Sequence, residues 1–508
     1  KNGDPDYYAI KANRTDIYFP RFGFEHRKHS LINPINYFFI SKIISDNWQN
    51  IKKVINKSRY TSSKPIFDPS DDRAILKPNF DSRDKFEMYI SSIQNYILRT
   101  DISRFFHSVY THSIPWAIYG KSHAKIHRSH SDYGNVLDLL VRNSQDGQTI
   151  GLPVGPDTSR VIAEIIAAAI DSEIKKTFPK GIEAFRFVDD YIVGVPTREL
   201  GDRLSSLIRK VLSEYELDIN HRKTSISPSG FSHLNGWKEE IRAIAPKVPF
   251  REIELERFFY AVEAIAKRGS EKNVYLFALN GLKYSFLRNQ DWIFIENRLL
   301  SIARIDSSLI APVCELLIKR NEVDTIHDKK NITKFILSNL RKFIDMRAYG
   351  ELTWLLHTCI KLGISVKASL VENLFYEENA FLAILLSDMS DRALIEGNIK
   401  RRVWNNYLTS DGLSSHMWLY AYEGTLKNFT KRSNTTFITS HSYFKHLFSK
   451  KIEFYRSSGS ILTVHEQMIR SSFNWQARQK TLSFGDDLDM EEEWDFSEVE
   501  DDFDDEYT

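Results

Sequence analysis

The chain has few cysteines and no long apolar run, and both absences narrow the class of protein. Its 508 residues include two cysteines, Cys314 and Cys359. Such a count excludes a disulfide framework and a zinc site with paired cysteines, and it is typical of a reducing compartment. A run of about 18 apolar residues, the length that a membrane-spanning helix needs, does not occur. The N-terminal residues also lack the apolar core of a signal peptide, so we expect a cytoplasmic protein without a membrane partner.

The formal net charge is only +2, but the acidic residues are unevenly distributed. Residues 486–508 contain 14 Asp or Glu and no Lys or Arg. Residues 1–485 hold 69 basic and 53 acidic residues, a balance of +16. This basic body fits a polyanionic partner such as nucleic acid or nucleotides, with simple solubility as the other interpretation. The tail at 485–508 is expected to be disordered, and a nucleic-acid mimic covering the basic body is a second hypothesis for it.

Apolar periodicity in the first half alternates between strand and helix, which favours layers of both. Predicted strands cover residues 97–106, 184–195 and 217–224. Predicted helices cover residues 37–54, 86–98, 133–143, 157–176 and 198–215.

From Glu252 to about Phe473 the pattern is almost entirely amphipathic helix. Helical pairs recur loosely at about 40 residues, as in a helical solenoid, and an irregular helical bundle is the alternative. Helices are expected there at residues 255–266, 299–317, 332–344, 352–360 and 381–386.

Residues 187–190, Phe-Val-Asp-Asp, are the most informative segment of the chain. The acidic pair lies between two largely apolar runs, the pattern of a β-hairpin with an acidic turn. Neighbouring anions repel each other, so a folded chain that keeps them is expected to bind a cation such as Mg²⁺. Asp-Asp alone is weak support, because ordinary solvated turns contain it as well.

A third carboxylate, Asp101, follows the apolar run at 97–100. In-line phosphoryl transfer uses two divalent ions, which need two or three carboxylates from different strands. Strand pairing around the acidic hairpin would place Asp101 beside Asp189. We therefore predict that Asp101, Asp189 and Asp190 are the catalytic metal ligands, with Mg²⁺ or Mn²⁺ as the cofactor.

Five segments, in the expected order, resemble the motifs of reverse transcriptases. They are residues 101–106, 151–156, 187–190, 217–224 and 234–237. The resemblance implies an α+β fold, with a fingers and palm domain followed by an all-α domain. It also implies a DNA nucleotidyltransferase that uses dNTPs and a two-metal mechanism.

The resemblance assigns roles to further residues. The carbonyl of Ile102 would add a metal ligand, and Phe106 would exclude a ribose 2′-hydroxyl, unless it simply packs in the core. Pro153 and Gly155 belong to the second, nucleotide-handling motif. Lys223 corresponds to a lysine near the triphosphate, where an ammonium can neutralise or protonate pyrophosphate, with a plain surface lysine as the alternative.

Two departures from the family pattern concern the template and the triphosphate. Val154 stands where retroelement enzymes typically carry Gln. The fingers strand that holds the triphosphate is not recognisable, which leaves Arg73, Lys77 and Arg83 as candidates for that role.

Residues 110–116, 148–151 and 155–160 resemble the abortive-infection (Abi) class of bacterial antiphage reverse transcriptases. This resemblance implies a HEAT-like helical domain, a homo-oligomer, and template-independent DNA synthesis primed on a protein tyrosine. The single-stranded DNA product would then stay attached to that tyrosine. Tyr8, followed by Tyr7, is the first candidate because both lie in a polar N-terminal arm, and a packed aromatic is the other interpretation.

Two alternatives remain at this point. One is a template-dependent, RNA-directed DNA polymerase of a defence or retroelement system, disfavoured by Val154 and by the missing fingers pattern. The other is a non-enzymatic scaffold, disfavoured because clustered anions repel each other and serve no purpose in a binding module. We expect four segments: an N-terminal arm and fingers at 1–100, a palm at 101–245 with a fingers insertion at about 107–150, a HEAT-like domain at 250–480, and the tail at 485–508.

Overall fold

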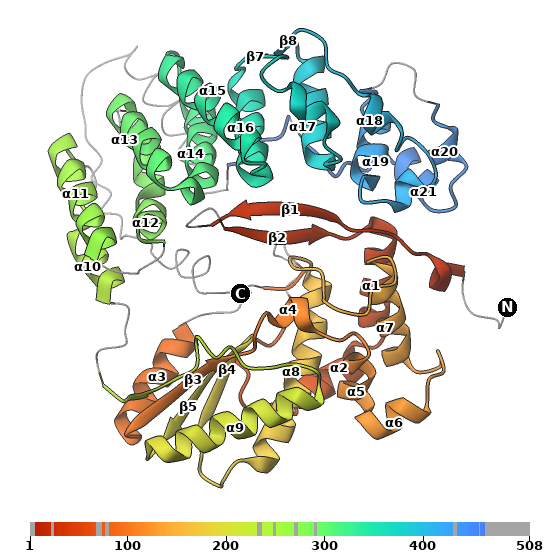
Figure 1. The fold of residues 1–508 in the computed structure, drawn as a ribbon, viewed down its shortest axis with the longest axis vertical. Coiled ribbons are helices and arrows are strands. Elements are labelled where there is room, and N and C mark those ends of the chain that lie inside the picture. The colour runs from red at the N-terminus through yellow and green to blue at the C-terminus, as the bar shows by residue number, and fades with distance from the viewer. Residues whose placement is uncertain are drawn as a thin grey trace, which may run out of the picture. The chain divides into compact units, whose positions relative to one another are not determined.

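The structure is a computed structural model of the 508-residue chain. It describes residues 6–21, 25–67, 74–76, 81–230, 236–246, 250–268, 273–288, 292–429, 434–456 and 458–462. The chain divides into two compact units (Figure 1). The first, the sheet unit, includes Lys1–Asp16 and His29–Leu234, and the second, the helical unit, includes Ile17–Lys28 and Asn235–Val499.

A four-stranded antiparallel sheet is the centre of the sheet unit. Its strands lie in the order β4 (Ala184–Phe187), β5 (Asp190–Val195), β3 (Tyr96–Asp101) and β6 (Ser225–Pro228). β5 is buried from Tyr191 to Val195, because helices pack against the sheet. α9 (Arg198–Glu214) packs against β3, β5 and β6, and α3 (Asp81–Ile93) contacts β3, β4 and β5.

A long buried helix, α8 (Asp157–Thr177), organises the rest of the sheet unit. It is buried nearly all round, as expected of a helix inside a core and not on its surface. α1 (Pro34–Asp46), α2 (Trp48–Ile55) and α5 (Ser113–Tyr119) pack around it. The remaining helices of this unit are η1 (Asp6–Ala9), α4 (Phe105–Ser108), α6 (Lys121–Ile126) and α7 (Tyr133–Asn143).

The two strands β1 (Thr15–Pro20) and β2 (His26–Leu31) pair with each other. Their central part, residues 17–28, belongs to the helical unit although both flanks belong to the sheet unit. His26 Nε2 lies 2.7 Å from Oε2 of the buried Glu351, and the Tyr18 carbonyl lies directly against Gly350. We call residues 17–28 the docked segment.

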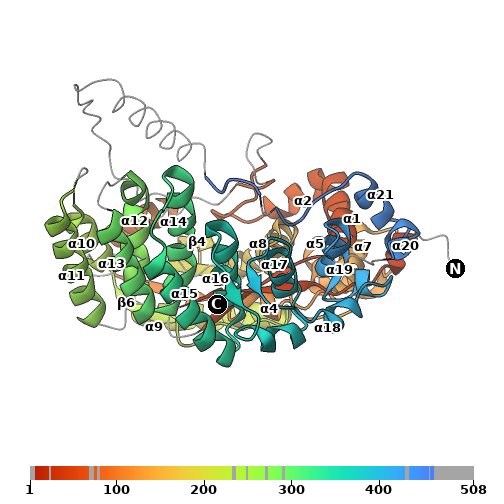
Figure 2. The ribbon, with the colours of Figure 1, turned by 90° about the horizontal axis from the view of Figure 1, so that it is seen from above.

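The helical unit is a series of helices that pack against helices one or two places away in sequence, such as α11 against α12 and α14 against α16 (Figures 1 and 2). Its first helices are α10 (Gly236–Ile244), α11 (Glu252–Arg268), α12 (Val274–Arg288), α13 (Trp292–Ile305), η4 (Ser307–Leu309) and α14 (Ile310–Val323). Next come α15 (Lys330–Asp345), α16 (Tyr349–Leu362), β7 (Val366–Lys367), η5 (Glu372–Tyr376), α17 (Ala380–Asp391) and β8 (Ile395–Glu396). The last are α18 (Arg402–Asn405), η6 (Gly412–Ser414), α19 (Trp418–Leu426), α20 (Thr436–Thr439) and α21 (Phe444–Ser449). The HEAT-like description stays a prediction.

Several elements expected from the sequence are confirmed. α7, α8 and α9 occupy the predicted ranges almost residue for residue, and β4 and β5 form the predicted hairpin. The α+β fold class, with a helical C-terminal region, is therefore correct.

Other expectations are wrong, for local reasons. The predicted strand at 217–224 is mostly a turn, and the strand beside β3 is instead β6. The predicted helix at 299–317 is two helices, because the Asp306 side chain accepts the N–H of Ser308 and starts a new element. The predicted helix at 37–54 divides at Asn47, and the one at 86–98 ends at Ile93 because β3 follows. Strands β1 and β2 were not expected.

No helix within the described ranges is both long enough and apolar enough to span a bilayer.

Candidate active site

The pairing of β3 with β5 brings the three predicted carboxylates together. In this register Asp101 is the partner of Asp190. The N–H of Ile102 donates to the carbonyl of Asp189 at 3.1 Å, which ties the end of β3 to the hairpin turn. Asp101 and Asp189 are each 2% exposed. The structure thus forms one acidic centre that includes Asp101 and Asp189, which lie 88 residues apart in the sequence.

Two cations lie next to the acidic centre. Lys223 Nζ is 3.2 Å from Asp101 Oδ2, and Arg83 Nη1 is 3.8 Å from Asp190 Oδ2. Burial raises the pKa of Asp189 well above its ordinary value, and the charges of Asp190 and Asp101 raise it further. Lys223 lowers the same pKa, but it is the smaller influence. The acidic centre therefore holds more negative charge than its protein surroundings stabilise.

A pocket of about 140 Å³ opens at this centre. Its lining residues are Arg83, Arg99, Thr100, Asp101, Asp190, Tyr191, Ile192 and Lys223. Arg99 forms an ion pair with Glu87, in which Arg99 Nε lies 3.0 Å from Glu87 Oε1.

The donor atoms of the acidic centre suit a hard divalent cation. Carboxylate oxygens are the preferred protein ligands of Mg²⁺ and Mn²⁺. Asp189 Oδ2 is buried and accepts no hydrogen bond from any described residue, so it retains capacity for a cation. Within the described ranges, no group of three or more His, Cys, Asp or Glu side chains is arranged so that it could hold a metal ion as it stands. The assignment of Asp101, Asp189 and Asp190 as metal ligands stays a prediction.

The turn after residue 217 hydrogen-bonds to the backbone of Asp101 and carries Lys223. The N–H of Asn220 donates to the Asp101 carbonyl at 2.9 Å, and the N–H of Ser103 donates to the Asp218 carbonyl at 2.8 Å. The hydroxyls of Thr100 and Thr224 lie 2.7 Å apart. The segment predicted to be a strand thus holds Asp101 and its neighbours in sequence through hydrogen bonds.

The loop at 151–156 lies beside α4. The N–H of Leu152 donates to the Phe106 carbonyl at 2.6 Å, and the N–H of Ser30 donates to the Val154 carbonyl at 2.8 Å. Gly155 has a φ of +109°, and a Cβ at this position would lie 3.2 Å from Nδ1 of His29. The loop therefore requires glycine at 155.

Phe106 and Pro153 are buried. Phe106 is 2% exposed and packs in the main core, with its ring centroid 5.7 Å from that of Phe105. Neither residue is among the described residues that line the acidic pocket. A role for Phe106 against the ribose 2′-hydroxyl stays a prediction.

Tyr7 and Tyr8 are packed and not loose. The Tyr7 ring stacks on Phe39 with centroids 3.9 Å apart, and Tyr8 meets Tyr7 edge to face. Asn143 donates to the Tyr8 carbonyl at 2.7 Å. Neither tyrosine is among the described residues that line the acidic pocket.

Some predicted residues lie outside the described ranges: Arg73, Lys77, Leu234, Asn235 and the acidic tail. Of the three candidate cations for the triphosphate, Arg83 is described, and it lies at the acidic centre.

The buried charges behind the acidic hairpin were not predicted from the sequence. Arg186 is fully buried and pairs with Glu164 and Asp171 of α8. Arg160, one turn before Glu164, is 8% exposed and donates to the Leu76 carbonyl at 2.8 Å. Charged residues on the apolar helix at 157–176 were the available signal, because buried charges are rare unless paired.

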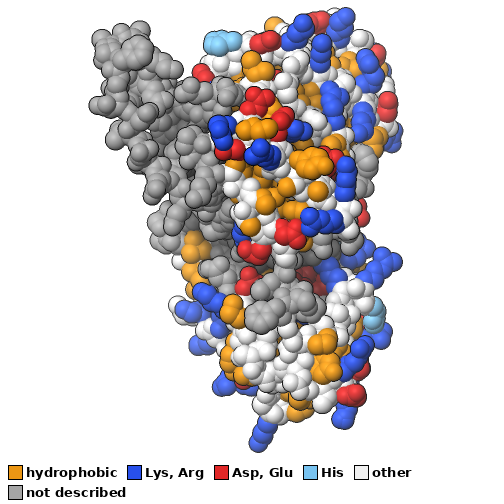
Figure 3. Space-filling model, turned by 90° about the vertical axis from the view of Figure 1, so that its left-hand side faces the viewer, with side chains coloured by type: hydrophobic (Ala, Val, Ile, Leu, Met, Phe, Trp, Pro, Cys, Tyr) orange, Lys and Arg blue, Asp and Glu red, His pale blue; other side chains and the backbone are white. Residues whose placement is uncertain are grey.

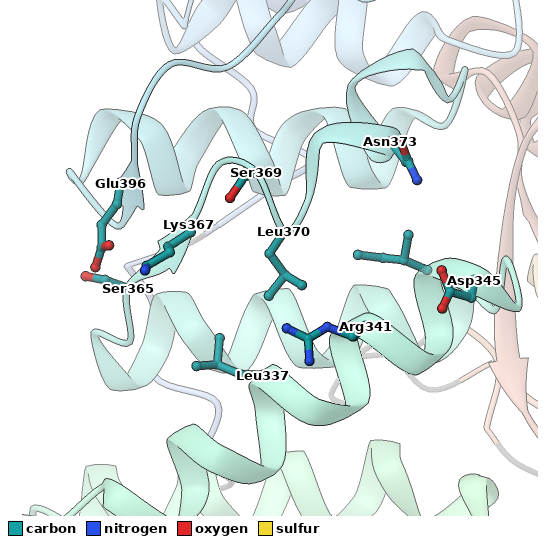
Figure 4. A pocket seen from close by; sticks show the side chains of 10 residues that line it. Leu337, Arg341, Asp345, Ser365, Lys367, Ser369, Leu370, Asn373 and Glu396 are labelled. Atoms are coloured by element: carbon teal, nitrogen blue, oxygen red, sulfur yellow. The ribbon is translucent and has the colours of Figure 1, made fainter.

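A second pocket, of about 580 Å³, lies in the helical unit between α15 and the segment around β7 (Figure 4). Arg341 and Lys367 point into it from these two elements, and Asp345 and Glu396 lie near its ends. Elsewhere on the helical unit, Lys and Arg side chains are mixed with acidic and apolar ones on the face in Figure 3. On this face, the described Lys and Arg side chains therefore do not form one basic patch.

Comparison with known families gives a match within the first half of the chain. Residues 35–242 match the family described as reverse transcriptase (RNA-dependent DNA polymerase). The matched range contains the whole four-stranded sheet and the acidic centre. This part of the chain is similar to reverse transcriptases, and a helical region follows it.

Among solved structures, the chain is similar to yeast telomerases. Apo telomerase from Candida tropicalis lacking its C-terminal domain is 11% identical, with a TM-score of 0.30, over 46% of this chain and 52% of that chain. Apo telomerase from the same organism is 12% identical, with a TM-score of 0.34, over 77% and 67%. Telomerase from Candida albicans with a fragment of telomeric RNA is 12% identical, with a TM-score of 0.27, over 65% of each. The chain thus spans about half the length of the first of these, and comparison with curated proteins found no match.

Proposed function

We propose that the chain is a metal-dependent DNA nucleotidyltransferase. The observation that supports this proposal is the meeting of Asp101 with Asp189 and Asp190 across β3 and β5, inside the range that matches reverse transcriptases. Buried carboxylates that repel each other are unfavourable for folding, so their presence at one point favours a catalytic purpose.

In the proposed reaction a hydroxyl oxygen forms a bond to the α-phosphorus of a dNTP. The bond from that phosphorus to pyrophosphate breaks, pyrophosphate leaves, and the hydroxyl proton passes to solvent. Bound Mg²⁺ or Mn²⁺ would supply stabilisation of the charge on the attacking and leaving oxygens. Asp101, Asp189 and Asp190 would hold the metal, together with the Ile102 carbonyl, and Lys223 and Arg83 would offer positive charge to the phosphates.

We propose more specifically that synthesis is template-independent, is primed on a tyrosine, and serves abortive-infection defence in the bacterial cytoplasm. The resemblance of residues 110–116, 148–151 and 155–160 to the Abi class supports this function, and so does Val154 in place of Gln. Single-stranded DNA linked to Tyr8 or Tyr7 would be the product, and a homo-oligomer the working form. Because both tyrosines pack on the sheet unit, priming requires the η1 segment to leave its packed position.

Template-dependent synthesis on RNA is the second candidate. The description of the matching family, an RNA-dependent DNA polymerase, favours it. In this case an RNA template is a required partner, and no DNA becomes attached to the protein.

One assay separates these possibilities. The purified protein is incubated with Mg²⁺ and labelled dNTPs, with and without an RNA template and primer, and analysed on a denaturing gel. Label that migrates with the protein in the absence of RNA supports protein-primed synthesis. Label that depends on RNA supports the second candidate, and no label under either condition contradicts polymerase activity.

Asp189→Asn tests the acidic centre in the same assay. We expect synthesis to fall by on the order of 10²-fold or more, the scale of losing a key electrostatic group. Asp202→Asn is the matched control, because Asp202 is an exposed residue of α9, and it should retain full activity. Near-normal synthesis by Asp189→Asn would show that the metal ligands are assigned wrongly.

A further inference from the structure

Val188 has an unfavourable backbone conformation in the turn that carries the acidic pair. Its φ is +51°, in the left-handed region where a β-branched residue is a rare outlier. β4 ends at Phe187 and β5 begins at Asp190, so Val188 and Asp189 form a two-residue hairpin connection. Such connections need positive φ at their first residue, a position that normally favours glycine. Surrounding groups must therefore maintain this conformation.

Both main-chain polar groups of Val188 are held by buried side chains. The Val188 N–H donates to Ser63 Oγ at 2.9 Å, and the Val188 carbonyl accepts from Arg186 Nη1 at 2.6 Å. Arg186 is fully buried and Ser63 is 2% exposed, so water does not compete for these bonds. The carbonyl of Val188 shares its peptide plane with the N–H of Asp189. The bond from Arg186 therefore also restricts the orientation of Asp189.

Arg186 is itself fixed by two carboxylates of α8. Its Nη2 donates to Glu164 Oε1 at 2.7 Å, and its Nε donates to Asp171 Oδ2 at 2.9 Å. Asp171 also accepts from the hydroxyls of Tyr191, at 2.7 Å, and Ser58, at 2.5 Å. The guanidinium thus donates hydrogen bonds both to α8 and to the turn. An ammonium group cannot reproduce this geometry.

The same network reaches residues 60–63, which follow α2. Ser63 lies on a stretch that runs along β4, where the N–H of Ser62 donates to the Arg186 carbonyl at 2.9 Å and the N–H of Arg186 donates to the Tyr60 carbonyl at 2.7 Å. The acceptor for the Val188 N–H is therefore supported by the backbone as well as by side chains.

We propose that Arg186 and Ser63 are positioning residues, which hold Val188 in its left-handed conformation and thereby orient Asp189 to bind the catalytic metal. This inference rests on the proposed function of the acidic centre. A purely structural ion pair accounts for the burial of Arg186 with Glu164 and Asp171. It does not account for the pairing of both polar groups of one strained residue next to the acidic pair.

Ser63→Ala tests the proposal with a small change. We expect weaker Mn²⁺ binding, measured by electron paramagnetic resonance without nucleotide, and a higher Mg²⁺ requirement for DNA synthesis, each by on the order of tenfold. Ser144→Ala is the matched control, because Ser144 is also a buried serine of the sheet unit, and its hydroxyl donates to the nearby Val141 carbonyl. Both variants should lose similar thermal stability, but Ser144→Ala should bind Mn²⁺ like the wild type.

Val188→Gly provides a rescue experiment. Glycine adopts positive φ without strain, so Val188→Gly combined with Ser63→Ala should recover a substantial part of the lost Mn²⁺ affinity. Arg186→Lys keeps the positive charge but loses the forked geometry, and it should weaken Mn²⁺ binding by a similar factor. If Arg186→Lys does not fold, Ser63→Ala and its rescue still test the proposal.

Two results would overturn the positioning role. One is a Ser63→Ala protein with the Mn²⁺ affinity and Mg²⁺ requirement of Ser144→Ala. The other is a double variant with Val188→Gly that recovers nothing. Asp189→Asn distinguishes these failures from failure of the proposed function: if it binds Mn²⁺ as the wild type does, the metal site itself is wrong. If Asp189→Asn loses Mn²⁺ and Ser63→Ala does not, the positioning role alone is wrong.

Discussion

At the scale of single residues, Asp189 has a position that is unfavourable for folding and useful for binding a cation. It is 2% exposed, its Oδ2 accepts no hydrogen bond from any described residue, and Asp190 and Asp101 lie close by. Burial and these two charges raise the pKa of Asp189 well above its ordinary value. Sites of this kind lose stability in exchange for function, and a bound metal offsets the loss.

Asp189→Asn should therefore stabilise the metal-free protein. The pKa of Asp189 is higher in the folded than in the unfolded state, so the folded state binds the proton more tightly. Stability therefore falls as the pH rises above the pKa that Asp189 has in the unfolded state. The gain in melting temperature from Asp189→Asn should be larger at about pH 8 than at about pH 5. Added Mg²⁺ should raise the melting temperature of the wild type but not that of the variant. A metal-free variant that melts below the wild type at both pH values would contradict this account.

At the scale of structural elements, the loop at 151–156 depends on backbone conformation more than on side chains. Gly151 and Gly155 both have positive φ, and main-chain bonds to Phe106 and Ser30 hold the loop in place. Turn residues of this kind are readable from the sequence, since glycine is the default residue at positive φ. The neighbours that hold the loop come from distant segments, so they cannot be read from the sequence.

Gly155→Ala should reduce both stability and DNA synthesis. An alanine at this φ is strained by about 1–2 kcal/mol, and its Cβ would also lie 3.2 Å from Nδ1 of His29. Gly181→Ala is the matched control: Gly181 has a φ of +85°, and a Cβ there meets nothing within 4 Å. Denaturant unfolding should show a loss for both variants, whereas steady-state synthesis should fall only for Gly155→Ala. Equal activity of the two proteins would argue against a role for this loop in nucleotide handling.

At the scale of the whole molecule, the docked segment determines how the chain is divided. Residues 17–28 belong to the helical unit, although residues 1–16 and 29–234 belong to the sheet unit. In the part of the chain up to residue 462, it therefore passes between the units after residues 16, 28 and 234. A single cut near residue 234 leaves one fragment that still carries part of the helical unit.

A protease site placed within residues 231–235 tests this arrangement. After cleavage, the two fragments should coelute in size-exclusion chromatography, because His26 and Tyr18 remain packed against α16. Gly350→Ala should release them, since its Cβ would collide with the Tyr18 carbonyl. Gly424→Ala is the control, a helical glycine whose Cβ would meet the Tyr420 ring at an ordinary 3.4 Å. If the fragments separate without any substitution, the docked segment does not keep the two fragments together.

The sequence by itself determined the features that depend on neighbouring residues. The alternation around residues 187–190 predicts the acidic hairpin, and the apolar spacing at 157–176 predicts α8, because both periodicities are local. The expected strand pairing around the acidic hairpin predicted that Asp101 would lie beside Asp189. In the structure Asp101 is the partner of Asp190, and the next residue, Ile102, donates to the Asp189 carbonyl.

Only the tertiary structure decided which distant groups complete these elements. The pairing of Lys223 with Asp101, the burial of Arg186 between α8 and the turn, and the docking of residues 17–28 each join parts of the chain that share no local pattern. Such contacts form because buried charges and main-chain groups must find partners once apolar surfaces have packed, and packing selects which partners lie within reach.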